Sequence, residues 1–491
     1  MRPRGALLTD LYELTMMQGY FRNGMHHHAV FDMFYRRQPF HGGFAVFAGL
    51  EHLLDRLERL SFTGDDIDYL RSLGLFGEDF LEYLRGFRFS GDLWSMPEGT
   101  LVFPQEPLIR VHTSIMEAQL IESMLLNTIN FQTLIATKTA RMYLSSKRGS
   151  IAEFGLRRAQ GEDGAMSASR AAYIGGASST SNTQAGKEYG IPVTGTMAHS
   201  WVMAFGSERE AFERYAEAYP DRAILLIDTY DTLGSGIDNA IQVGLKLREQ
   251  GHRLGVRLDS GDIQYLSKQV RRRLDAAGLD DAVIAVSNEL DEQIIHQLVS
   301  AGSPVDLWGV GTQMVTGGGD AALTGVYKLA ATQREADGPF QPTMKVSDNP
   351  EKSTNPGIKQ VWRFFGEGDY PIADLITLED APPVRAGANS RGAEPVRFYH
   401  PAGDYRKFSL KSWSRAEPLL VRFMADGRRV ADQAPLASIR ERTLANLDRL
   451  DETYTRIINP HIYKVSVSRS LRELKREFLK RYLADDENGE V

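Results

Sequence analysis

The stretch from about residue 150 to residue 330 most constrains the fold, because it repeats one pattern of a short apolar run, a polar turn and an amphipathic helical segment. Seven apolar runs have the character of strands: residues 151–156, 173–177, 192–196, 223–228, 253–258, 282–287 and 305–310. Helical periodicity lies between them at residues 207–218, 236–250, 263–277 and 291–301. Strands that alternate with helices form parallel βα units with right-handed crossovers. Seven uneven units in succession predict an α/β fold with an irregular (β/α) barrel of about seven parallel strands.

The two ends of the chain have a different pattern. Residues 7–20 and 114–146 are predicted to be helical, and residues 30–35 and 44–47 to be strands. Further strands are expected at residues 360–365, 396–399 and 419–424, before two charged helices. We therefore expect residues 1–113 to form the N-terminal part of a second α/β domain, 114–340 the barrel that carries the active site, and 341–491 the part that completes the second domain.

Composition excludes several classes of protein. The 491 residues include no cysteine, which rules out disulfides, thiolate nucleophiles and cysteine-ligated metal clusters. The net charge is −7, and acidic residues such as Glu473 and Glu477 interrupt the basic C-terminal segment, so a nucleic-acid partner is not expected. No apolar run approaches the roughly 20 residues of a membrane span, so we expect a cytoplasmic protein without a membrane partner.

Polar residues follow each predicted barrel strand, and in such a barrel the turns after the strands meet at one mouth. The arginines there offer forked donors to phosphate or carboxylate oxygens. Turns rich in glycine and serine open helices whose first N–H groups attract anions, and aspartates can hold Mg²⁺. The sequence thus predicts a site for an anionic substrate and a metal ion, although this pattern does not define the reaction.

Four segments carry a resemblance to a known family: residues 8–16 (LTDLYELTM), 153–158 (EFGLRR), 195–201 (GTMAHSW) and 256–262 (VRLDSGD). Together they resemble nicotinate phosphoribosyltransferases, which are type II phosphoribosyltransferases. The resemblance implies transfer of a phosphoribosyl group from 5-phosphoribosyl 1-pyrophosphate to nicotinate, giving nicotinate mononucleotide and pyrophosphate in the salvage of NAD. It also implies Mg²⁺ as cofactor, ATP as co-substrate, a ligase-type classification and a homodimer.

The resemblance assigns roles to four catalytic residues. His199 resembles the histidine that ATP phosphorylates, whereas an isolated histidine in a barrel would more often only form a hydrogen bond in a loop. Arg257 resembles an arginine that holds the base, although on its own it could pair with a structural aspartate. Asp228 and Asp259 resemble acidic residues near the ribose and Mg²⁺, which they would hold directly or through water. Either aspartate could instead cap the helix that follows it.

The remaining expected contacts bind substrate: Tyr12, Phe154, Arg157, Ser181, Thr196, Gly309, Gly311, Thr312 and Lys328. Phe154 would stack on the pyridine ring, and Tyr12 would reach the neighbouring active site of a homodimer. Ser181 favours nicotinate, because relatives that take nicotinamide resemble this chain but carry aspartate at the matching place, which would repel a carboxylate. Gly309, Gly311 and Thr312 resemble the 5′-phosphate loop.

Two alternatives to the nicotinate enzyme remain at this stage. One is a nicotinamide phosphoribosyltransferase, which would use the same chemistry on an uncharged base. The other is a catalytically silent relative that only binds a nucleotide. The presence of His199, Asp228, Arg257 and Asp259 argues against loss of the catalytic residues.

Overall fold

The computed structural model describes residues 5–335, 338–347, 353–401 and 406–487. The chain divides into two compact units, one formed by residues 1–133 and 322–491 and the other by residues 134–321. The second unit is therefore shorter at both ends than the barrel expected at residues 114–340. The reason is that the strand Gly325–Gln333 (β12) pairs along its whole length with the strand His28–Tyr35 (β1) in the first unit.

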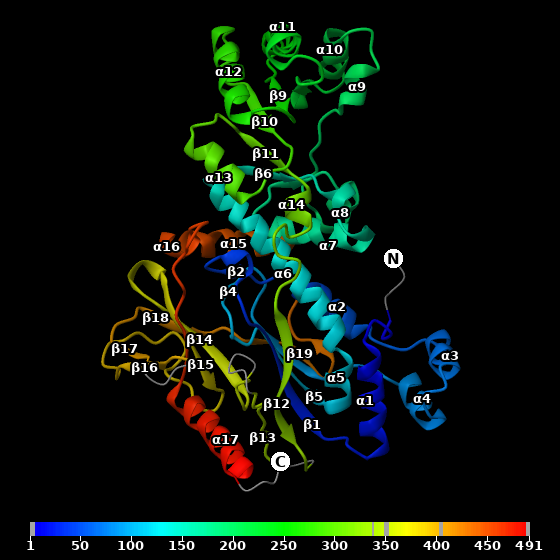
Figure 1. The fold of residues 1–491 in the computed structure, drawn as a ribbon, viewed down its shortest axis with the longest axis vertical. Helices are drawn as coiled ribbons and strands as arrows, with labels where there is room; N and C mark the ends of the chain where they lie inside the picture. Colours follow the sequence, from blue (N-terminus) through cyan, green and yellow to red (C-terminus); the bar gives the residue numbers. More distant parts are fainter. Residues whose placement is uncertain (1–4, 336–337, 348–352, 402–405, 488–491) are drawn as a thin grey trace. The chain divides into compact units, whose positions relative to one another are not determined.

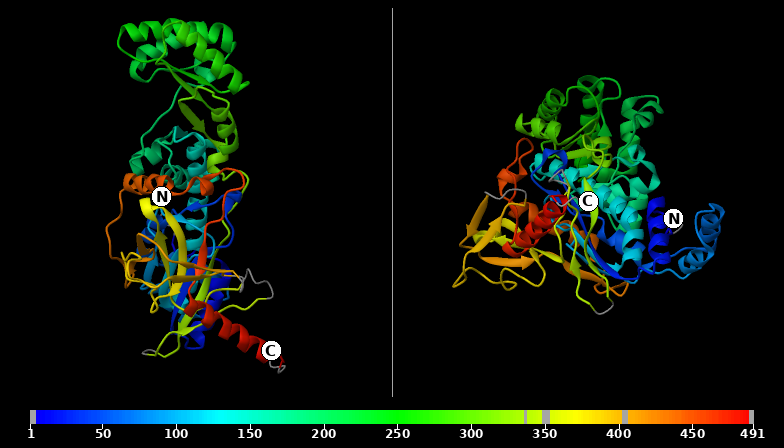
Figure 2. Two further views of the ribbon diagram at one scale, coloured as in Figure 1. Left: turned by 90° about the vertical axis from the view of Figure 1, so that its left-hand side faces the viewer. Right: turned by 60° about the horizontal axis from the view of Figure 1, so that its bottom comes forward.

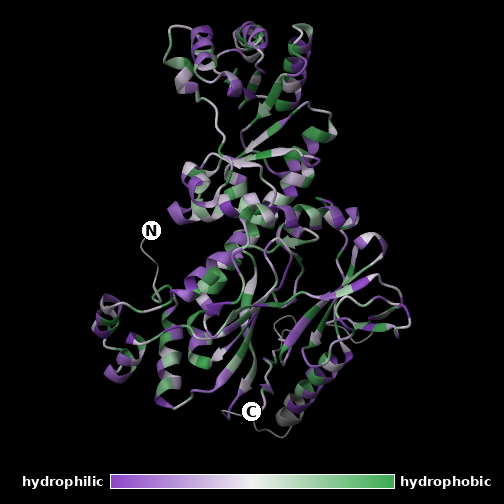
Figure 3. Ribbon diagram, turned by 180° about the vertical axis from the view of Figure 1, so that it is seen from behind, coloured by the Kyte–Doolittle hydropathy of each residue, from purple (hydrophilic) through white to green (hydrophobic). Residues whose placement is uncertain are grey.

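The second unit alternates strands with helices, as the sequence pattern predicts (Figure 2). Six parallel strands form its sheet in the order β7-β6-β11-β10-β9-β8. Their bounds are Ser150–Glu153 (β6), Ser179–Thr180 (β7), Ile224–Leu226 (β8), Gly255–Leu258 (β9), Val283–Val286 (β10) and Leu307–Val310 (β11). Strands β8, β10 and β11 are nearly continuous apolar runs, typical of parallel strands buried on both faces (Figure 3, in which green marks hydrophobic residues).

The helices of the second unit follow the strands, and their bounds are Leu156–Arg158 (η2), Gly161–Ile174 (α7), Thr183–Tyr189 (α8), His199–Met203 (α9), Glu208–Ala218 (α10), Pro220–Arg222 (η3), Thr232–Gly236 (η4), Ile237–Glu249 (α11), Ile263–Ala276 (α12), Glu292–Ser300 (α13) and Thr312–Val315 (α14). Polar side chains cap several of them. Asn182 accepts from the amide of Ala185 at 3.2 Å, and Asp262 accepts from that of Tyr265 at 3.0 Å. The residues just after the strands therefore start the helices as well as facing the sheet edge.

Two of the predicted strands differ from the structure. The strand expected at residues 173–177 is wrong, because α7 remains helical to Ile174 and β7 begins at Ser179. An apolar run at the end of a buried helix resembles a strand when only its composition is considered. The strand expected at 192–196 is reduced to one parallel bridge between Val193 and Thr180. Hydrogen bonds among the described residues do not show a closed ring of strands, so β7 and β8 end the six-stranded sheet.

The first unit contains two larger sheets and one two-stranded sheet. The seven-stranded sheet has the order β13-β12-β1-β5-β3-β19-β20, and the six-stranded sheet the order β17-β16-β21-β15-β14-β18 (Figure 1). Their further strands are Asp92–Ser95 (β3), Ile109–Ser114 (β5), Gln341–Pro342 (β13), Lys359–Phe365 (β14), Pro371–Leu378 (β15), Val396–Tyr399 (β16), Lys407–Leu410 (β17), Arg415–Pro418 (β18), Val421–Ala425 (β19), Arg428–Arg429 (β20) and Val465–Val467 (β21). The short sheet pairs Ala45–Val46 (β2) with Leu101–Val102 (β4). Both ends of the chain contribute strands to this unit.

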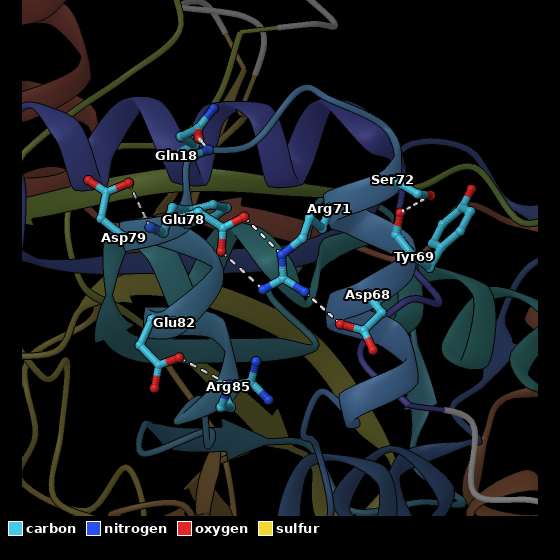
Figure 4. Close-up of polar contacts among 11 residues, drawn as sticks. Gln18, Asp68, Tyr69, Arg71, Ser72, Glu78, Asp79, Glu82 and Arg85 are labelled. Carbon is cyan, nitrogen blue, oxygen red and sulfur yellow. Dashed lines mark hydrogen bonds and ion pairs between the residues drawn. The ribbon is translucent and has the colours of Figure 1, made fainter.

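Helices of the first unit are Leu11–Arg22 (α1), Leu50–Glu58 (α2), Gly64–Ser72 (α3), Glu78–Arg85 (α4), Ile115–Leu120 (α5), Leu436–Arg449 (α15), Glu452–Thr455 (α16) and Arg469–Glu487 (α17). The single helix expected over 114–146 is divided near Ile121 into α5 and Glu122–Ser145 (α6), within which the boundary between the units falls. Arg71 joins α3 to α4 by donating to both oxygens of Glu78, at 2.8 and 3.0 Å (Figure 4). This pair is exposed and water-screened, so buried residues such as Ile67 and Phe80 contribute more to holding the two helices in place.

Candidate active site

A cavity of about 390 Å³ lies in the second unit, at and beyond the carboxyl ends of β6, β7, β9, β10 and β11. Its lining combines cations, carboxylates, one aromatic ring and small polar residues: Phe154, Arg157, Arg158, Ser181, Gly195, Thr196, Met197, Ala198, Arg257, Asp259, Ser287, Asn288, Glu289, Gly309, Gly311 and Thr312. Parallel strands place their carboxyl ends at one edge of the sheet, which is why residues far apart in the chain share this cavity. Nine of the expected catalytic and substrate-binding residues line the cavity: Phe154, Arg157, Ser181, Thr196, Arg257, Asp259, Gly309, Gly311 and Thr312.

Arg257 supplies a largely buried positive charge to the cavity. Its guanidinium donates to Thr196 Oγ1, while its Nε is buried and has no hydrogen-bond partner within the described chain. Burial lowers the pKa of Arg257, whereas the charges of Asp259 and Asp228 raise it. Since arginine remains protonated near neutral pH, the unpaired N–H makes this side chain suited to binding an anion.

Phe154 forms the aromatic wall of the cavity, and a glycine makes room for its ring. A Cβ atom on Gly309 would lie 2.7 Å from two carbons of the Phe154 ring, which is closer than such atoms approach. Phe154 is also fixed through its backbone, because its amide donates to the carbonyl of Val310 at 2.7 Å. Gly309 therefore allows the half-buried ring of Phe154 to pack directly against β11.

Asp228 and Asp259 form a linked acidic pair after β8 and β9. Asp228 Oδ2 accepts from the amide of Asp259 at 3.0 Å and from Ser260 Oγ at 2.6 Å. Asp259 Oδ1 accepts from Ser287 Oγ. Asp228 Oδ1 is buried without a hydrogen-bond partner in the part of the chain that the structure describes. This pair presents carboxylate oxygens beside the cavity.

The structure does not support helix capping as the role of these two aspartates. The side chain that caps α12 is Asp262, and the one that starts η4 is Asp231, which accepts from the amide of Gly234 at 2.9 Å. Asp228 and Asp259 stand three residues earlier in each turn. Asp228 instead accepts from the loop after β9, and Asp259 accepts from Ser287.

His199 begins α9 and contacts the acidic pair. Its Nδ1 lies 3.1 Å from Thr229 Oγ1, and its Nε2 lies 3.8 Å from Asp259 Oδ2. The His199 side chain is 40% exposed, so a solvent-borne ligand can reach it. His199 is not itself among the residues that line the cavity, but both Ala198 before it and Asp259 beside it are. The geometry places Arg257, Asp259 and His199 around one location.

Ser181 lies at the end of β7, and the cap of the next helix is its neighbour Asn182. The amide of Ser181 donates to the carbonyl of Glu153 at 2.9 Å. Glu153 is buried and accepts from Ser169 at 2.8 Å and from Thr180 at 2.6 Å, which ties β6, β7 and α7 together. The Ser181 side chain is therefore not needed as the cap and lines the cavity.

Tyr12 and Lys328 belong to the first unit. Tyr12 is on the first turn of α1 and is 49% exposed. Lys328 is on β12, with its Nζ 3.4 Å from Glu122 Oε1. Their expected roles as substrate contacts stay predictions.

Some lining residues were not among the expected site residues: Arg158, Gly195, Met197, Ala198, Ser287, Asn288 and Glu289. Ser287, Asn288 and Glu289 follow β10, so the rule that polar residues after the barrel strands meet at one mouth includes them, although no substrate contact was assigned to them. Asn288 also has a φ of 116°, a left-handed conformation that asparagine tolerates better than most residues and that occurs at functional sites. Met197 and Ala198 carry no chemical signal that sequence reasoning could use.

Within the described residues, no group of three or more His, Cys, Asp or Glu side chains is arranged to hold a metal ion, and no helix is long and apolar enough to cross a membrane. Any metal at this site would depend on one or two carboxylates, with its other ligands coming from water or substrate. Mg²⁺ is commonly held in this way when its substrate carries phosphates.

The fold and the cavity define a class of protein: an α/β protein with a cavity suited to an anionic ligand at the carboxyl edge of a parallel sheet. Family models describe the same chain in three successive parts. The nicotinate phosphoribosyltransferase N-terminal domain matches residues 7–130, the nicotinate phosphoribosyltransferase family residues 150–366, and the nicotinate phosphoribosyltransferase C-terminal domain residues 358–475.

Whole-chain relatives agree with the family models. The nicotinate phosphoribosyltransferase of Bacillus subtilis is 44% identical over 94% of this chain and 93% of its own length, and that of Homo sapiens is 34% identical over 95% of both chains. The crystal structure of human nicotinic acid phosphoribosyltransferase superposes with a TM-score of 0.82 at 32% identity, covering 96% of this chain and 99% of that one. The chain belongs to the nicotinate phosphoribosyltransferase family.

Proposed function

We propose that the protein transfers the phosphoribosyl group of 5-phosphoribosyl 1-pyrophosphate to nicotinate, giving nicotinate mononucleotide and pyrophosphate for the salvage of NAD in the cytoplasm. The observation that carries this proposal is the cavity in which the buried Arg257, the ring of Phe154 and the carboxylate of Asp259 lie together. The names of the whole-chain relatives support the same activity. We also propose that the sheet closes into an irregular barrel, in which residues 192–196 extend the sheet beyond β7 from the bridge between Val193 and Thr180.

Nicotinate requires a cation for its carboxylate and a flat surface for its ring. Arg257 and Arg157 supply forked donors, and the Nε of Arg257 has a free N–H. The half-buried ring of Phe154 offers its face to the pyridine, and Ser181 adds no negative charge beside the carboxylate. The positive charge of Arg257, whose Nε has no hydrogen-bond partner among the described residues, is the reason to prefer nicotinate over nicotinamide.

The activated sugar requires negative charge near its ribose and hydrogen-bond donors around its 5′-phosphate. Displacement of pyrophosphate passes through an oxocarbenium-like state, and the carboxylates of Asp228 and Asp259 stabilise the positive charge that develops on the ribose. Gly309, Gly311 and Thr312 follow β11, and Thr312 opens α14, whose first amides have no acceptor within the helix. These residues hold the 5′-phosphate, with Thr196 and Lys328 as additional contacts.

The residues present fit Mg²⁺, because Asp228 Oδ1 is a buried carboxylate oxygen with no partner within the described residues and Asp259 lies directly beside it. When bound, Mg²⁺ supplies positive charge that stabilises pyrophosphate as a leaving group. Asp228 and Asp259 would hold it directly or through water.

The same site couples the reaction to ATP through His199. The Nε2 of its neutral ring attacks the γ-phosphorus; the N–P bond forms as the bond to the leaving ADP oxygen breaks. Thr229 holds Nδ1 at 3.1 Å, which fixes the ring and leaves Nε2 as the nucleophile. The phosphorylated imidazole then carries negative charge close to Asp259, which changes the binding of the pyrophosphorylated sugar.

The enzyme acts as a homodimer in which Tyr12 reaches the neighbouring active site.

The proposal is tested by product formation. The protein is mixed with 5-phosphoribosyl 1-pyrophosphate, Mg²⁺ and either nicotinate or nicotinamide, with and without ATP, and the mononucleotide is measured. We expect nicotinate mononucleotide, stimulation by ATP, and a strong preference for the acid. The variant His199→Ala is expected to retain slow transfer and to lose ATP coupling. Product from nicotinamide alone would indicate the nicotinamide enzyme, and no product with either base would indicate a silent relative.

A further inference from the structure

Glu153 is a buried acid beside the cavity. It is the last residue of β6, its exposed fraction is 1%, and it precedes Phe154 without lining the cavity itself. The described residues give its carboxylate no ion pair. A buried charge without a cationic partner is costly unless hydrogen bonds compensate it. Three donors do so here: the amide of Gly155 and the hydroxyls of Ser169 and Thr180.

One oxygen of this carboxylate fixes the turn that carries Phe154. Glu153 Oε1 accepts from the amide of Gly155, and the amide of Phe154 donates to the carbonyl of Val310 at 2.7 Å. The amides on both sides of the Phe154 side chain are therefore held. Gly155 also precedes η2, whose Arg157 lines the cavity. The positions of the ring and of that guanidinium thus depend on Oε1.

The other oxygen fixes the turn that carries Ser181. Glu153 Oε2 accepts from Thr180 Oγ1 at 2.6 Å, and the same hydroxyl oxygen accepts from the amide of Asn182 at 2.9 Å. The amide of Ser181 donates to the backbone carbonyl of Glu153, also at 2.9 Å. Ser169, on α7, donates to Oε2 at 2.8 Å and does not line the cavity. Both amides beside the Ser181 side chain thus lead to Glu153.

We propose that Glu153 is a positioning residue for the base, because its single carboxylate holds Phe154 and Ser181 at the spacing that nicotinate needs. This inference rests on the proposed function, since nicotinate is taken as the ligand that contacts both side chains. Glu153 does not touch the substrate and acts through the two turns. A displacement of about 1 Å can cost roughly 100-fold in rate, so a loosened turn should weaken the use of the base.

The variant Glu153→Gln tests the carboxylate with almost no change in volume. Its amide NH2 must face either the amide of Gly155 or the two hydroxyls, so a donor replaces an acceptor in one of the two turns. We expect KM for nicotinate to rise about tenfold or more and KM for 5-phosphoribosyl 1-pyrophosphate to stay within about twofold of the wild type. A purely structural role would lower the fraction of folded enzyme, and hence the apparent kcat, without raising either KM.

The matched control is Glu208→Gln. Glu208, on α10, is 6% exposed, accepts from Asn239 at 3.0 Å and does not line the cavity. The variant makes the same chemical change at another buried acid of the second unit, so neither KM should change. Equal increases of KM for nicotinate in the two variants would overturn the proposal.

A second pair of variants tests the same link if Glu153→Gln does not fold. Thr180→Val removes the hydroxyl that joins Glu153 to the amide of Asn182 and keeps the branched shape, whereas Thr180→Ser keeps the hydroxyl. We expect Thr180→Val to raise KM for nicotinate about threefold or more and Thr180→Ser to raise it less. Equal KM values in the two variants would show that the hydroxyl does not position Ser181, contrary to the proposal.

Amide hydrogen exchange measures how firmly the two turns are held without any substrate. Residues 154–158 and 181–183 should exchange about tenfold or more faster in Glu153→Gln than in the wild type, and Glu208→Gln should leave both segments unchanged. Unchanged exchange in either turn, or an unchanged KM for nicotinate in folded Glu153→Gln, would overturn the proposal. If the wild type forms no product, the proposed function is contradicted, whereas the exchange rates still decide whether Glu153 holds the two turns.

Discussion

Two buried polar atoms define the chemistry of the site at the scale of single residues. Arg257 Nε is a donor and Asp228 Oδ1 an acceptor, and neither has a partner among the residues that the structure describes. Buried polar groups in proteins are nearly always paired with protein, water or ligand. We therefore expect an anionic group to bind at Arg257 Nε and a cationic or metal-bound group to bind at Asp228 Oδ1.

The guanidinium of Arg257 is the first group to test. Arg257→Lys keeps the charge but removes the fork that can hold a carboxylate with two hydrogen bonds. We expect kcat/KM for nicotinate to fall by about 10- to 100-fold, corresponding to about 1.4–2.8 kcal/mol of transition-state binding. The control is Arg253→Lys, because Arg253 precedes the same strand and donates to the carbonyl of Asp281 outside the cavity. Equal losses in both variants would contradict the assigned role.

Ser181 is the residue expected to select the base. Ser181→Asp places a negative charge in the cavity, where it repels the carboxylate of nicotinate and can accept from the amide of nicotinamide. The ratio of kcat/KM for the two bases should shift toward nicotinamide by about tenfold or more, since 1.4 kcal/mol is one factor of ten. Ser178→Asp, at a half-buried position before β7 that does not line the cavity, is the matched control, and an unchanged ratio in Ser181→Asp would refute the interpretation.

At the scale of elements, the loop after β9 carries two aspartates, and we expect a structural role for Asp262 and a functional role for Asp259. Asp262→Ala removes the cap of α12 and should lower the free energy of unfolding by about 1 kcal/mol, with little effect on turnover. Asp259→Asn keeps that cap and should instead lower kcat by about 100-fold or more through lost transition-state charge stabilisation. Urea unfolding and steady-state kinetics on both variants measure the two effects, and the reverse pattern would exclude this division of roles.

The packing of β11 against Phe154 gives another prediction. Gly309→Ala puts a methyl group 2.7 Å from the ring, so the ring must move. We expect a loss of about 1–3 kcal/mol in unfolding free energy and a higher KM for nicotinate. Gly64→Ala, at a position with open space around the added carbon, should do neither.

How much of each element the sequence could predict depended on where its contacts are. Strands β8 to β11 and helices α10 to α13 follow local periodicity, and the structure confirms them. Strand β12 was not predicted, because its sequence GVYKLAATQ does not alternate regularly between apolar and polar residues, and its pairing with β1 cannot be inferred from this segment alone. Of the site, charged and glycine residues at strand ends could be predicted, whereas Met197 and Ala198 line the cavity only because of the path of their loop.

At the scale of the whole molecule, stability should depend on a buried histidine. Burial and the charge of Arg110 lower the pKa of His112, on β5, to about 3. As the pH falls from about 6.5, the unfolded chain takes up a proton that the folded protein does not accept until about pH 3. The free energy of unfolding should therefore decrease over this range, by up to about 1.4 kcal/mol for each pH unit.

His112→Gln should reduce this pH dependence, and His41→Gln, at an exposed histidine of the same unit, should not. The measurement is urea unfolding at pH 7 and pH 5. If the wild type and His112→Gln lose the same free energy of unfolding between the two pH values, another group is responsible for the pH dependence.

We propose that the cavity formed by Arg257, Phe154 and Asp259 joins nicotinate to the activated sugar. This is tested by the rate at which nicotinate mononucleotide forms in parallel reactions of the wild-type protein, Arg257→Ala and Arg253→Lys. We expect product from the wild type and Arg253→Lys, and a rate about 100-fold or more lower for folded Arg257→Ala. No product from the wild type, or an unchanged rate in Arg257→Ala, would contradict it.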